Sequence, residues 1–161
     1  MKPTCMFIHG LESSSQGTKG AYFREYYPGI ILEDFEGPFQ ARMEKLEAIL
    51  AGKKDLILVG SSYGGLMAAV YACLHEERVK KLILLAPALH LEPYAPYLSK
   101  KLSMPVFILH GIRDDVVPLE AVRKIAGQLF LSHEFHAVDD DHSLHSTFAG
   151  LDWDALLGDV G

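Results

Sequence analysis

Short apolar runs alternate with longer amphipathic stretches along most of this 161-residue chain. Three of the runs are apolar at almost every position; the strongest, Leu56–Gly60, reads Leu-Ile-Leu-Val-Gly. A strand that is covered on both faces has this continuous apolar pattern, and such strands belong to parallel sheets. The pattern predicts six strands, of which the last is the weakest: Cys5–His9, Ile30–Phe35, Leu56–Gly60, Leu82–Ala86, Val106–His110 and His133–Val138.

Helical periodicity fills several of the intervals between these runs. In Phe39–Leu50 the apolar residues share one face, whereas Tyr63–Leu74 is apolar or small almost throughout and predicts a buried helix. A proline in the first turn indicates a helix over Pro118–Leu131, and a last helix is expected over about Ser143–Leu157. Alternating strands and helices form right-handed crossovers that cover both sheet faces. The predicted fold class is therefore α/β, a three-layer α/β/α sandwich with a mostly parallel six-stranded sheet, in one domain over residues 1–161.

Composition and charge exclude several classes of protein. Apolar residues make up 49% of the chain and charged residues 22%, which is ordinary for a soluble globular domain. A formal net charge of −6 argues against a nucleic-acid or anionic-membrane partner, because either would require a basic face. The two cysteines are too few for a disulfide scaffold, and no apolar run has the length of a membrane span or the flanks of a signal peptide. We therefore expect a cytoplasmic protein.

Histidine and aspartate are the residues that could suggest a metal. The chain has eight histidines and an acidic run at Asp139–Asp141. Neither follows a metal-ligand spacing such as His-Glu-x-x-His. We expect no metal and no cofactor, and we interpret the acidic run as a solvated loop.

The third predicted strand leads into Gly-Ser-Ser-Tyr-Gly at 60–64, where the buried helix begins. Gly-x-Ser-x-Gly between a strand and a helix is typical of a nucleophile elbow, a sharp turn that exposes its serine, here Ser62, above the sheet. Gly60 and Gly64 suit this turn because side chains there would clash, and the helix N-terminus favours developing negative charge. The alternative is a phosphate-binding turn, but a Walker lysine and Gly-x-Gly-x-x-Gly are both lacking.

Four segments in chain order, of which the elbow is the second, resemble the α/β-hydrolase superfamily across nearly the whole chain. The others are Ile-His-Gly-Leu at 8–11, His-Gly-Ile-Arg-Asp-Asp-Val-Val-Pro at 110–118 and Asp-His-Ser-Leu at 141–144. The resemblance implies a trimmed sheet with strand order 2-1-3-4-5-6 and a small, cap-less serine esterase. It also implies a catalytic triad of Ser62, Asp114 and His142, in the chain order that this fold uses. The oxyanion hole would use backbone N–H groups of Leu11 and Tyr63.

The implied chemistry needs these residue types, and two of the assignments have close rivals. A serine hydroxyl becomes nucleophilic when histidine removes its proton, and a buried carboxylate fixes the histidine tautomer. The His-Gly-x-x-Asp spacing selects Asp114 over Asp115, for which a solvated loop charge is the simpler interpretation. His142 lies in a loop, with Ser143 as a plausible helix N-cap, and is favoured over His145.

Only Pro87–Ser103 lies where larger relatives insert a cap domain. We expect a short crossover helix there, the start of which could form one wall of a shallow pocket with His90 and Tyr94 near the substrate. His9 and His110, which end their strands beside glycine, are expected to form local hydrogen bonds.

These features predict a hydrolase that cleaves small carboxylic esters through an acyl-enzyme. Its expected partner is a small-molecule ester, and the sequence does not set the oligomeric state. A thioesterase, a peptidase, a dienelactone-type hydrolase or a C–C bond hydrolase would share the triad. A non-catalytic binding protein that kept the fold is the alternative outside enzymes, although such a protein has no need of all three residues.

Overall fold

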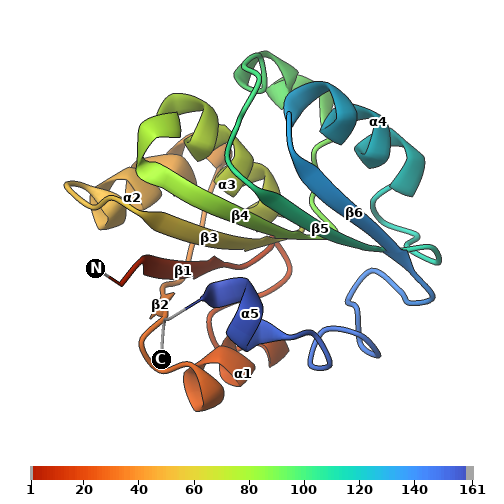
Figure 1. Cartoon of the computed structure of the whole chain (residues 1–161), viewed down its shortest axis with the longest axis horizontal. Helices are drawn as coiled ribbons and strands as arrows, with labels where there is room; N and C mark the ends of the chain where they lie inside the picture. The colour runs from red at the N-terminus through yellow and green to blue at the C-terminus, as the bar shows by residue number, and fades with distance from the viewer. Residues whose placement is uncertain (1, 159–161) are drawn as a thin grey trace.

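A computed structural model of the protein describes residues 2–158. A six-stranded sheet forms its centre, in the order β2-β1-β3-β4-β5-β6 with every neighbouring pair parallel (Figure 1). The strands are β1 (Thr4–Ile8), β2 (Ile31–Leu32), β3 (Leu56–Ser61), β4 (Val79–Leu85), β5 (Val106–Gly111) and β6 (His133–Val138). The helices are α1 (Thr18–Tyr26), α2 (Phe39–Leu50), α3 (Tyr63–Leu74), α4 (Leu119–Leu129) and α5 (Trp153–Leu157), with 3₁₀ turns η1 (Glu76–Arg78) and η2 (Glu92–Tyr97). The predicted fold class and strand order are confirmed.

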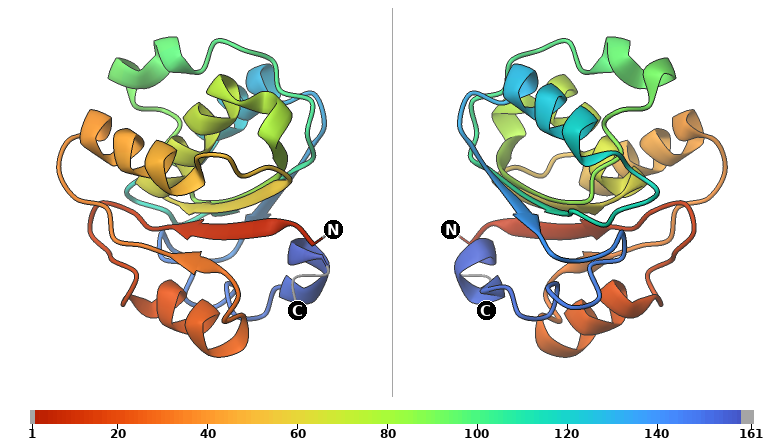
Figure 2. Two further views of the ribbon diagram at one scale, coloured as in Figure 1. Left: turned by 90° about the vertical axis from the view of Figure 1, so that its left-hand side faces the viewer. Right: turned by 90° about the vertical axis from the view of Figure 1, so that its right-hand side faces the viewer.

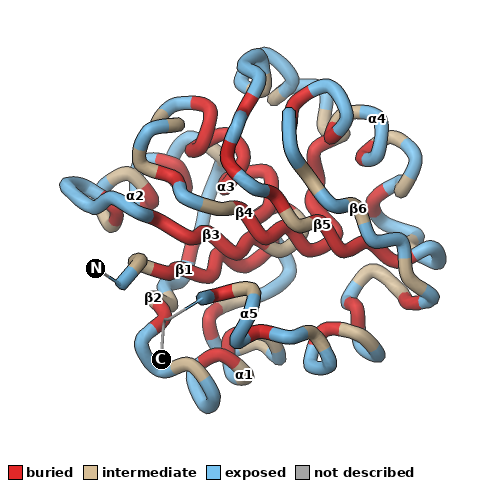
Figure 3. Tube along the Cα trace, in the orientation of Figure 1, coloured by how far each residue is buried: buried red, intermediate tan, exposed pale blue. Residues whose placement is uncertain are grey.

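The sheet is buried on both faces. Helices α2, α3 and α4 cover one face, and α1 and α5 cover the other (Figures 1 and 2). Successive side chains of a strand point to opposite faces. In β1, Met6 and Ile8 join the apolar cluster on the α2–α3 side, whereas Cys5 and Phe7 join the cluster on the α1–α5 side. This two-sided burial explains the continuous apolar runs, and the buried stretches follow the central strands (Figure 3).

Three predicted elements match at both ends, two helices and strand β6 (His133–Val138), and one helix was not predicted. Helices α2 and α3 have the predicted bounds. Helix α1 escaped prediction because its apolar face is weak and Gly20 lies within it. The glycine is required by packing, because a Cβ at Gly20 would overlap the backbone of Ser15.

Strand β2 is shorter than the predicted Ile30–Phe35. Only Ile31–Leu32 pairs with β1. Beyond it the chain forms other hydrogen bonds: the carboxylate of Asp34 accepts from the N–H of Ser15 at 2.7 Å, and the N–H of Phe35 donates to Nε2 of His9 at 2.9 Å. These contacts draw the chain away from the sheet edge after two residues.

The predicted helix over Ser143–Leu157 is wrong for most of its length, because only α5 is helical. Residues 143–152 form turns instead. The carboxylate Oδ2 of Asp140 accepts from the backbone N–H groups of Ser146 and Thr147. A side chain that takes up backbone donors in this way competes with helix formation. Among the described residues, no helix has the length and apolar character needed to cross a membrane.

Candidate active site

The loop between β3 and α3 holds Ser62 in a strained backbone conformation. Its φ of 55° lies in the left-handed region, which non-glycine residues seldom adopt. Two hydrogen bonds fix this geometry: the N–H of Ser62 donates to the carbonyl of Leu85 at 2.9 Å, and the carbonyl of Ser62 accepts from the N–H of Ala88 at 2.9 Å. The end of β4 therefore holds the turn, and Ser62 stands at the carboxyl edge of the sheet.

The two elbow glycines are needed for space. A Cβ at Gly60 would overlap the backbone of Gly64, and a Cβ at Gly64 would overlap the carbonyl of Ile8. The steric reason predicted for both glycines is therefore confirmed.

The structure brings Ser62, His142 and Asp114 together in one chain of hydrogen bonds. The Nδ1 atom of His142 lies 2.8 Å from Oδ2 of Asp114, and its Nε2 lies 3.2 Å from Oγ of Ser62. An ionised carboxylate only accepts hydrogen bonds, so Nδ1 carries the proton and the lone pair of Nε2 faces Ser62. This arrangement lets the imidazole take a proton from the serine hydroxyl.

The carboxylate of Asp114 is fully buried and fully partnered. Its Oδ1 accepts from the N–H groups of Val116 and Val117 at 2.9 and 2.7 Å, and its Oδ2 also lies 3.3 Å from Nε2 of His110. Burial of a charge is tolerated when hydrogen bonds satisfy it. Asp115 is exposed, so the structure places Asp114 rather than its neighbour beside the histidine.

The rival histidine, His145, has a different partner. Its Nδ1 lies 2.7 Å from Oδ2 of Asp141, and its side chain is 70% exposed. This hydrogen bond lowers the pKa of Asp141 to about 2. The structure therefore brings His142, and not His145, to Ser62.

Of the two predicted oxyanion donors, Tyr63 belongs to the elbow and Leu11 to the loop after β1. Tyr63 opens α3, so its N–H belongs to the first turn, where backbone donors lack intrahelical acceptors. Leu11 follows Gly10, whose carbonyl accepts from Nδ1 of His9 at 2.7 Å. The N–H of Leu11 belongs to the same planar peptide unit and points the opposite way from that carbonyl. The buried His9 ring thus orients the peptide of Leu11. This role is more specific than the local hydrogen bond that was predicted for His9.

A cavity of about 760 Å³ opens beside Ser62 and His142. Its walls are the loop after β1, including Leu11, one face of α1, and the segment that follows His142. No position in Pro87–Ser103 is among its lining residues. The expectation that this segment begins one wall of the pocket does not hold for this cavity, which lies on the α1 side of the sheet.

His90 and Tyr94 are not brought to this cavity. The hydroxyl of Tyr63 donates to that of Tyr94 at 3.0 Å, and the Tyr94 ring centroid lies 4.4 Å from that of Phe39. His90 has a buried Nδ1 without a hydrogen-bond partner among the described residues. Substrate contact by either residue stays a prediction.

Asp140 supports the loop of His142 in a way that the sequence did not reveal. It is 1% exposed, so the interpretation of Asp139–Asp141 as a solvated loop is wrong for its middle residue. Burial raises the pKa of Asp140, but hydrogen bonds from Thr147, Asp141 and Ser146 outweigh burial and hold it below its usual value. A buried carboxylate thus organises the loop that carries His142.

Replacing Asp140 with alanine is expected to lower the free energy of unfolding by about 2–4 kcal/mol, because several backbone donors lose a buried, charged acceptor. Chemical denaturation measures this change. Asp139→Ala is the matched control, since that side chain is 80% exposed and should matter far less. Equal destabilisation by both substitutions would contradict this role of Asp140.

The free energy of unfolding should also decrease as the pH falls, because unfolding allows His110 to take up a proton. Burial lowers the pKa of this fully buried ring, and the charges of His142 and His90 lower it further, against the raising effects of the Val117 carbonyl and Asp114. The unfolded pKa is about 6.5. The stabilising contribution of the neutral ring is therefore complete above about pH 6.5 and lost as pH falls toward the lower folded pKa.

We expect Tm to decrease between pH 7.5 and pH 5, as followed by circular dichroism. The Nε2 atom of His110 lies 2.9 Å from the carbonyl of Val117. His110→Gln keeps an N–H near that carbonyl and takes up no proton, so its Tm should fall less over the same interval. Parallel Tm profiles for the two proteins would count against His110 as the source.

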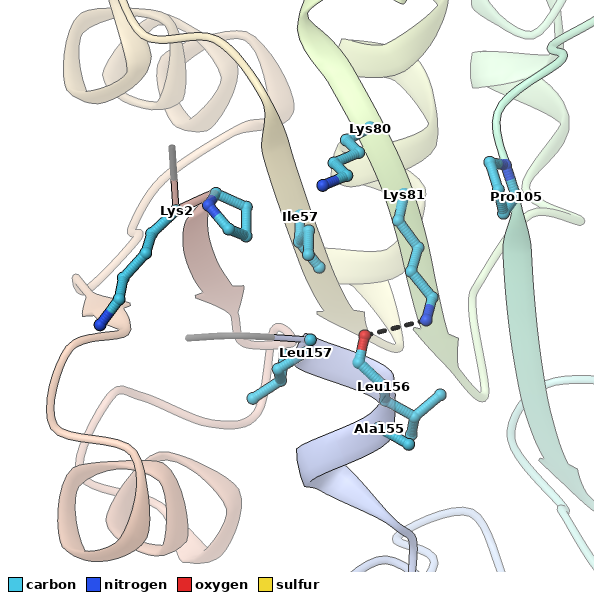
Figure 4. A pocket seen from close by; sticks show the side chains of 10 residues that line it. Lys2, Ile57, Lys80, Lys81, Pro105, Ala155, Leu156 and Leu157 are labelled. Carbon is cyan, nitrogen blue, oxygen red and sulfur yellow. Dashed lines mark hydrogen bonds between the residues drawn. The ribbon is translucent and has the colours of Figure 1, made fainter. Parts of the chain in front are cut away.

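A second cavity, of about 640 Å³, lies at the opposite end of the sheet (Figure 4). It opens at the amino ends of β3 and β4 beside α5, where Nζ of Lys81 donates to the carbonyl of Leu156 at 2.9 Å. Burial lowers the pKa of Lys81. None of Ser62, Asp114 and His142 lines this cavity. Within residues 2–158, no group of three His, Cys, Asp or Glu side chains could hold a metal ion.

Comparison with known proteins establishes the family. The sequence model of the alpha/beta hydrolase fold matches residues 13–98, more than half of the chain and including Ser62. The chain therefore belongs to the α/β-hydrolase family. A search of curated protein sequences gives no match.

Solved structures agree with this fold. Est1E from Butyrivibrio proteoclasticus superposes with a TM-score of 0.80 at 20% identity, over 97% of this chain and 86% of that one. Alpha/beta hydrolase domain-containing protein 10 from mouse gives 0.76 at 20% identity, over 91% and 84%. The monoacylglycerol lipase of Paleococcus ferrophilus gives 0.77 at 15% identity, over 97% and 95%.

Proposed function

We propose that this protein is a serine hydrolase that cleaves small carboxylic esters through an acyl-enzyme. The hydrogen-bonded chain from Ser62 through His142 to the buried Asp114 carries the proposal. In this group of three residues Ser62 supplies the nucleophile, His142 is placed to take its proton, and Asp114 fixes the histidine tautomer.

In the first half of the reaction, Oγ of Ser62 attacks the ester carbonyl carbon while Nε2 of His142 takes the hydroxyl proton. The N–H groups of Leu11 and Tyr63 bind the oxyanion; loss of one such donor typically slows catalysis by about 10²–10³-fold. The bond from carbon to the alcohol oxygen then breaks, and His142 gives its proton to the leaving alcohol. A water molecule, activated by His142 in the same way, hydrolyses the acyl-enzyme and releases the acid.

The structural neighbours support an ester substrate. One neighbour is named a monoacylglycerol lipase, and another is named an esterase of Pyrococcus furiosus. A structure of Est1E contains ferulic acid, a carboxylic acid such as ester hydrolysis releases. These names belong to proteins of 15–19% identity, and they favour esters over the other substrates of the triad.

The test compares substrates that share one acyl group. The butyryl ester of p-nitrophenol, a butyryl thioester and butyryl p-nitroanilide present the same acyl chain on oxygen, sulfur and nitrogen. We expect the highest kcat/KM for the ester. Turnover of the thioester alone, or of the anilide alone, would contradict the proposal.

Acyl chains of two to about six carbons should give the highest kcat/KM among p-nitrophenyl esters. Segment 87–103 packs against the α2–α3 side, with Leu91 and Tyr94 on the core, and forms no cap (Figure 2). Each buried CH₂ contributes roughly 0.8 kcal/mol, but a site without a cap covers only a few of them. The measurement is kcat/KM across the acyl series, below and above the critical micelle concentration. Values that rise steadily to twelve or so carbons, or activation by micelles, would contradict a small acyl site.

A further inference from the structure

The cavity beside Ser62 has an apolar opening. Residues 2–158 expose seven large apolar side chains, and three of them line this cavity: Leu11, Tyr26 and Val116, at 54%, 58% and 60% exposure. Apolar side chains that gather at one opening are a sign of a surface that binds an apolar group.

Aromatic rings continue this apolar surface into the cavity. The ring centroid of Tyr22 lies 4.8 Å from that of Tyr26 and 5.2 Å from that of Phe148, the latter pair edge to face. All three rings line the cavity, two from α1 and one from the segment after His142. Such walls accept flat or aliphatic groups, and aromatic pairs add to the free energy of burial.

The charged groups of the cavity give no site for an anion. Nζ of Lys19 donates to the carbonyl of Ser143 at 2.7 Å and lies 5.5 Å from the centre of the Phe148 ring. Burial lowers the pKa of this lysine, which ties α1 to the loop of His142. The other side chains with full charges on the lining are the exposed carboxylates of Glu12 and Glu25. An uncharged ligand suits this lining best.

The position of His142 indicates which half of an ester enters. In the proposed mechanism His142 hands a proton from Nε2 to the alcohol oxygen, so the alcohol must lie next to this ring. The cavity wall beyond His142 consists of Ser143 to His145 and Phe148, the continuation of the same segment. A group attached to the alcohol oxygen therefore runs along this wall and against α1.

We propose that the cavity between α1 and residues 142–149 binds the alcohol half of the substrate, and that the preferred alcohols are uncharged and apolar, with aromatic alcohols included. This inference rests on the proposed esterase function and adds the leaving-group class. The enzyme then combines a small acyl group with a larger apolar alcohol.

Isomeric esters test the proposal, because they carry their larger group either on the alcohol side or on the acyl side of the ester bond. Hexyl acetate is compared with ethyl hexanoate, and benzyl acetate with methyl phenylacetate. We expect kcat/KM to be at least about tenfold higher for each acetate, since its large group is buried in the cavity. Equal values, or a preference for ethyl hexanoate and methyl phenylacetate, would overturn the proposal.

A substitution that fills the cavity provides the second arm. Ala21 lies on α1 and lines the cavity, so Ala21→Trp should bring the ratio of kcat/KM for benzyl acetate over ethyl acetate close to one. Ala41→Trp places the same ring at an exposed site on α2, across the sheet, and should keep the wild-type ratio. An Ala21→Trp ratio equal to that of wild type would overturn the assignment of the cavity.

Failure of the inference is distinguishable from failure of the function. If Ser62 hydrolyses the esters without preference for a large alcohol, only the leaving-group assignment falls. If no ester is hydrolysed and Ser62 does not react with a fluorophosphonate, both proposals fall.

Discussion

Replacing Ser62 with alanine is expected to reduce kcat for p-nitrophenyl butyrate by at least about 10⁴-fold. The substitution removes only the hydroxyl that lies 3.2 Å from Nε2 of His142. The hydrogen bonds that fix the elbow come from the backbone of Ser62, to Leu85 and from Ala88, so the fold should persist. Steady-state kinetics measures the loss, and an unchanged Tm shows that the loss is chemical.

The neighbouring serine is the matched control for this variant. Ser61 is the last residue of β3 and forms no part of the hydrogen-bonded chain through His142. Ser61→Ala should therefore keep substantial activity. If the Ser61 and Ser62 variants hydrolysed the ester equally well, the assignment of the nucleophile would be wrong.

Asp114→Asn should lower kcat by about 10³–10⁴-fold, because it favours the wrong tautomer of His142. Oδ1 of Asp114 accepts two backbone N–H groups, so the amide oxygen of asparagine must take that position. The amide NH₂ then faces Nδ1 of His142 and moves the ring proton to Nε2. An imidazole in that state cannot accept the proton of Ser62.

Two pairs of variants complete this prediction. Asp115→Asn alters an exposed side chain and should have a much smaller effect than Asp114→Asn. His142→Ala should impair kcat far more than His145→Ala, because His145 is bonded to Asp141 instead. A reversed order in either pair would refute that assignment and leave the fold family intact.

The parts of the fold that the sequence predicts are those governed by local pattern. Helix α2 has its apolar residues on one face and α3 is apolar or small almost throughout, and the bounds of both helices agree at both ends. The parallel sheet was evident because strands buried on both faces carry continuous apolar runs, as in β3. The order of the strands came from the family motifs, since no local pattern determines which strands become neighbours.

The errors lie where hydrogen bonds between side chains and backbone groups decide the conformation. The N–H of Phe35 bonds to His9 and shortens β2, and the carboxylate of Asp140 takes the backbone donors of a predicted helix. A buried aspartate within an acidic run has no signal that separates it from its exposed neighbours. Such contacts appear only once the chain is folded.

The candidate site likewise has a part that sequence motifs indicate and a part that they do not. The family resemblance pointed to Ser62, Asp114 and His142, and the structure joins these three side chains in one chain of hydrogen bonds. The cavity was expected beside Pro87–Ser103 and lies against α1. Its walls join residues more than a hundred positions apart, as in the hydrogen bond from Lys19 to the carbonyl of Ser143, a separation of 124 residues. No pattern in the sequence predicts that contact.

The most direct test of the central claim is covalent labelling by a fluorophosphonate, which reacts with an activated serine far faster than with other side chains. Intact-protein mass spectrometry and peptide mapping should show one probe per chain, attached to Ser62, with hydrolysis lost in proportion to labelling. Ser62→Ala should take up none, and Asp114→Asn should react far more slowly than wild type. Wild-type protein that remains unlabelled, or that is labelled at another serine while Ser62 stays free, would contradict the account and favour a hydrolase fold used only for binding.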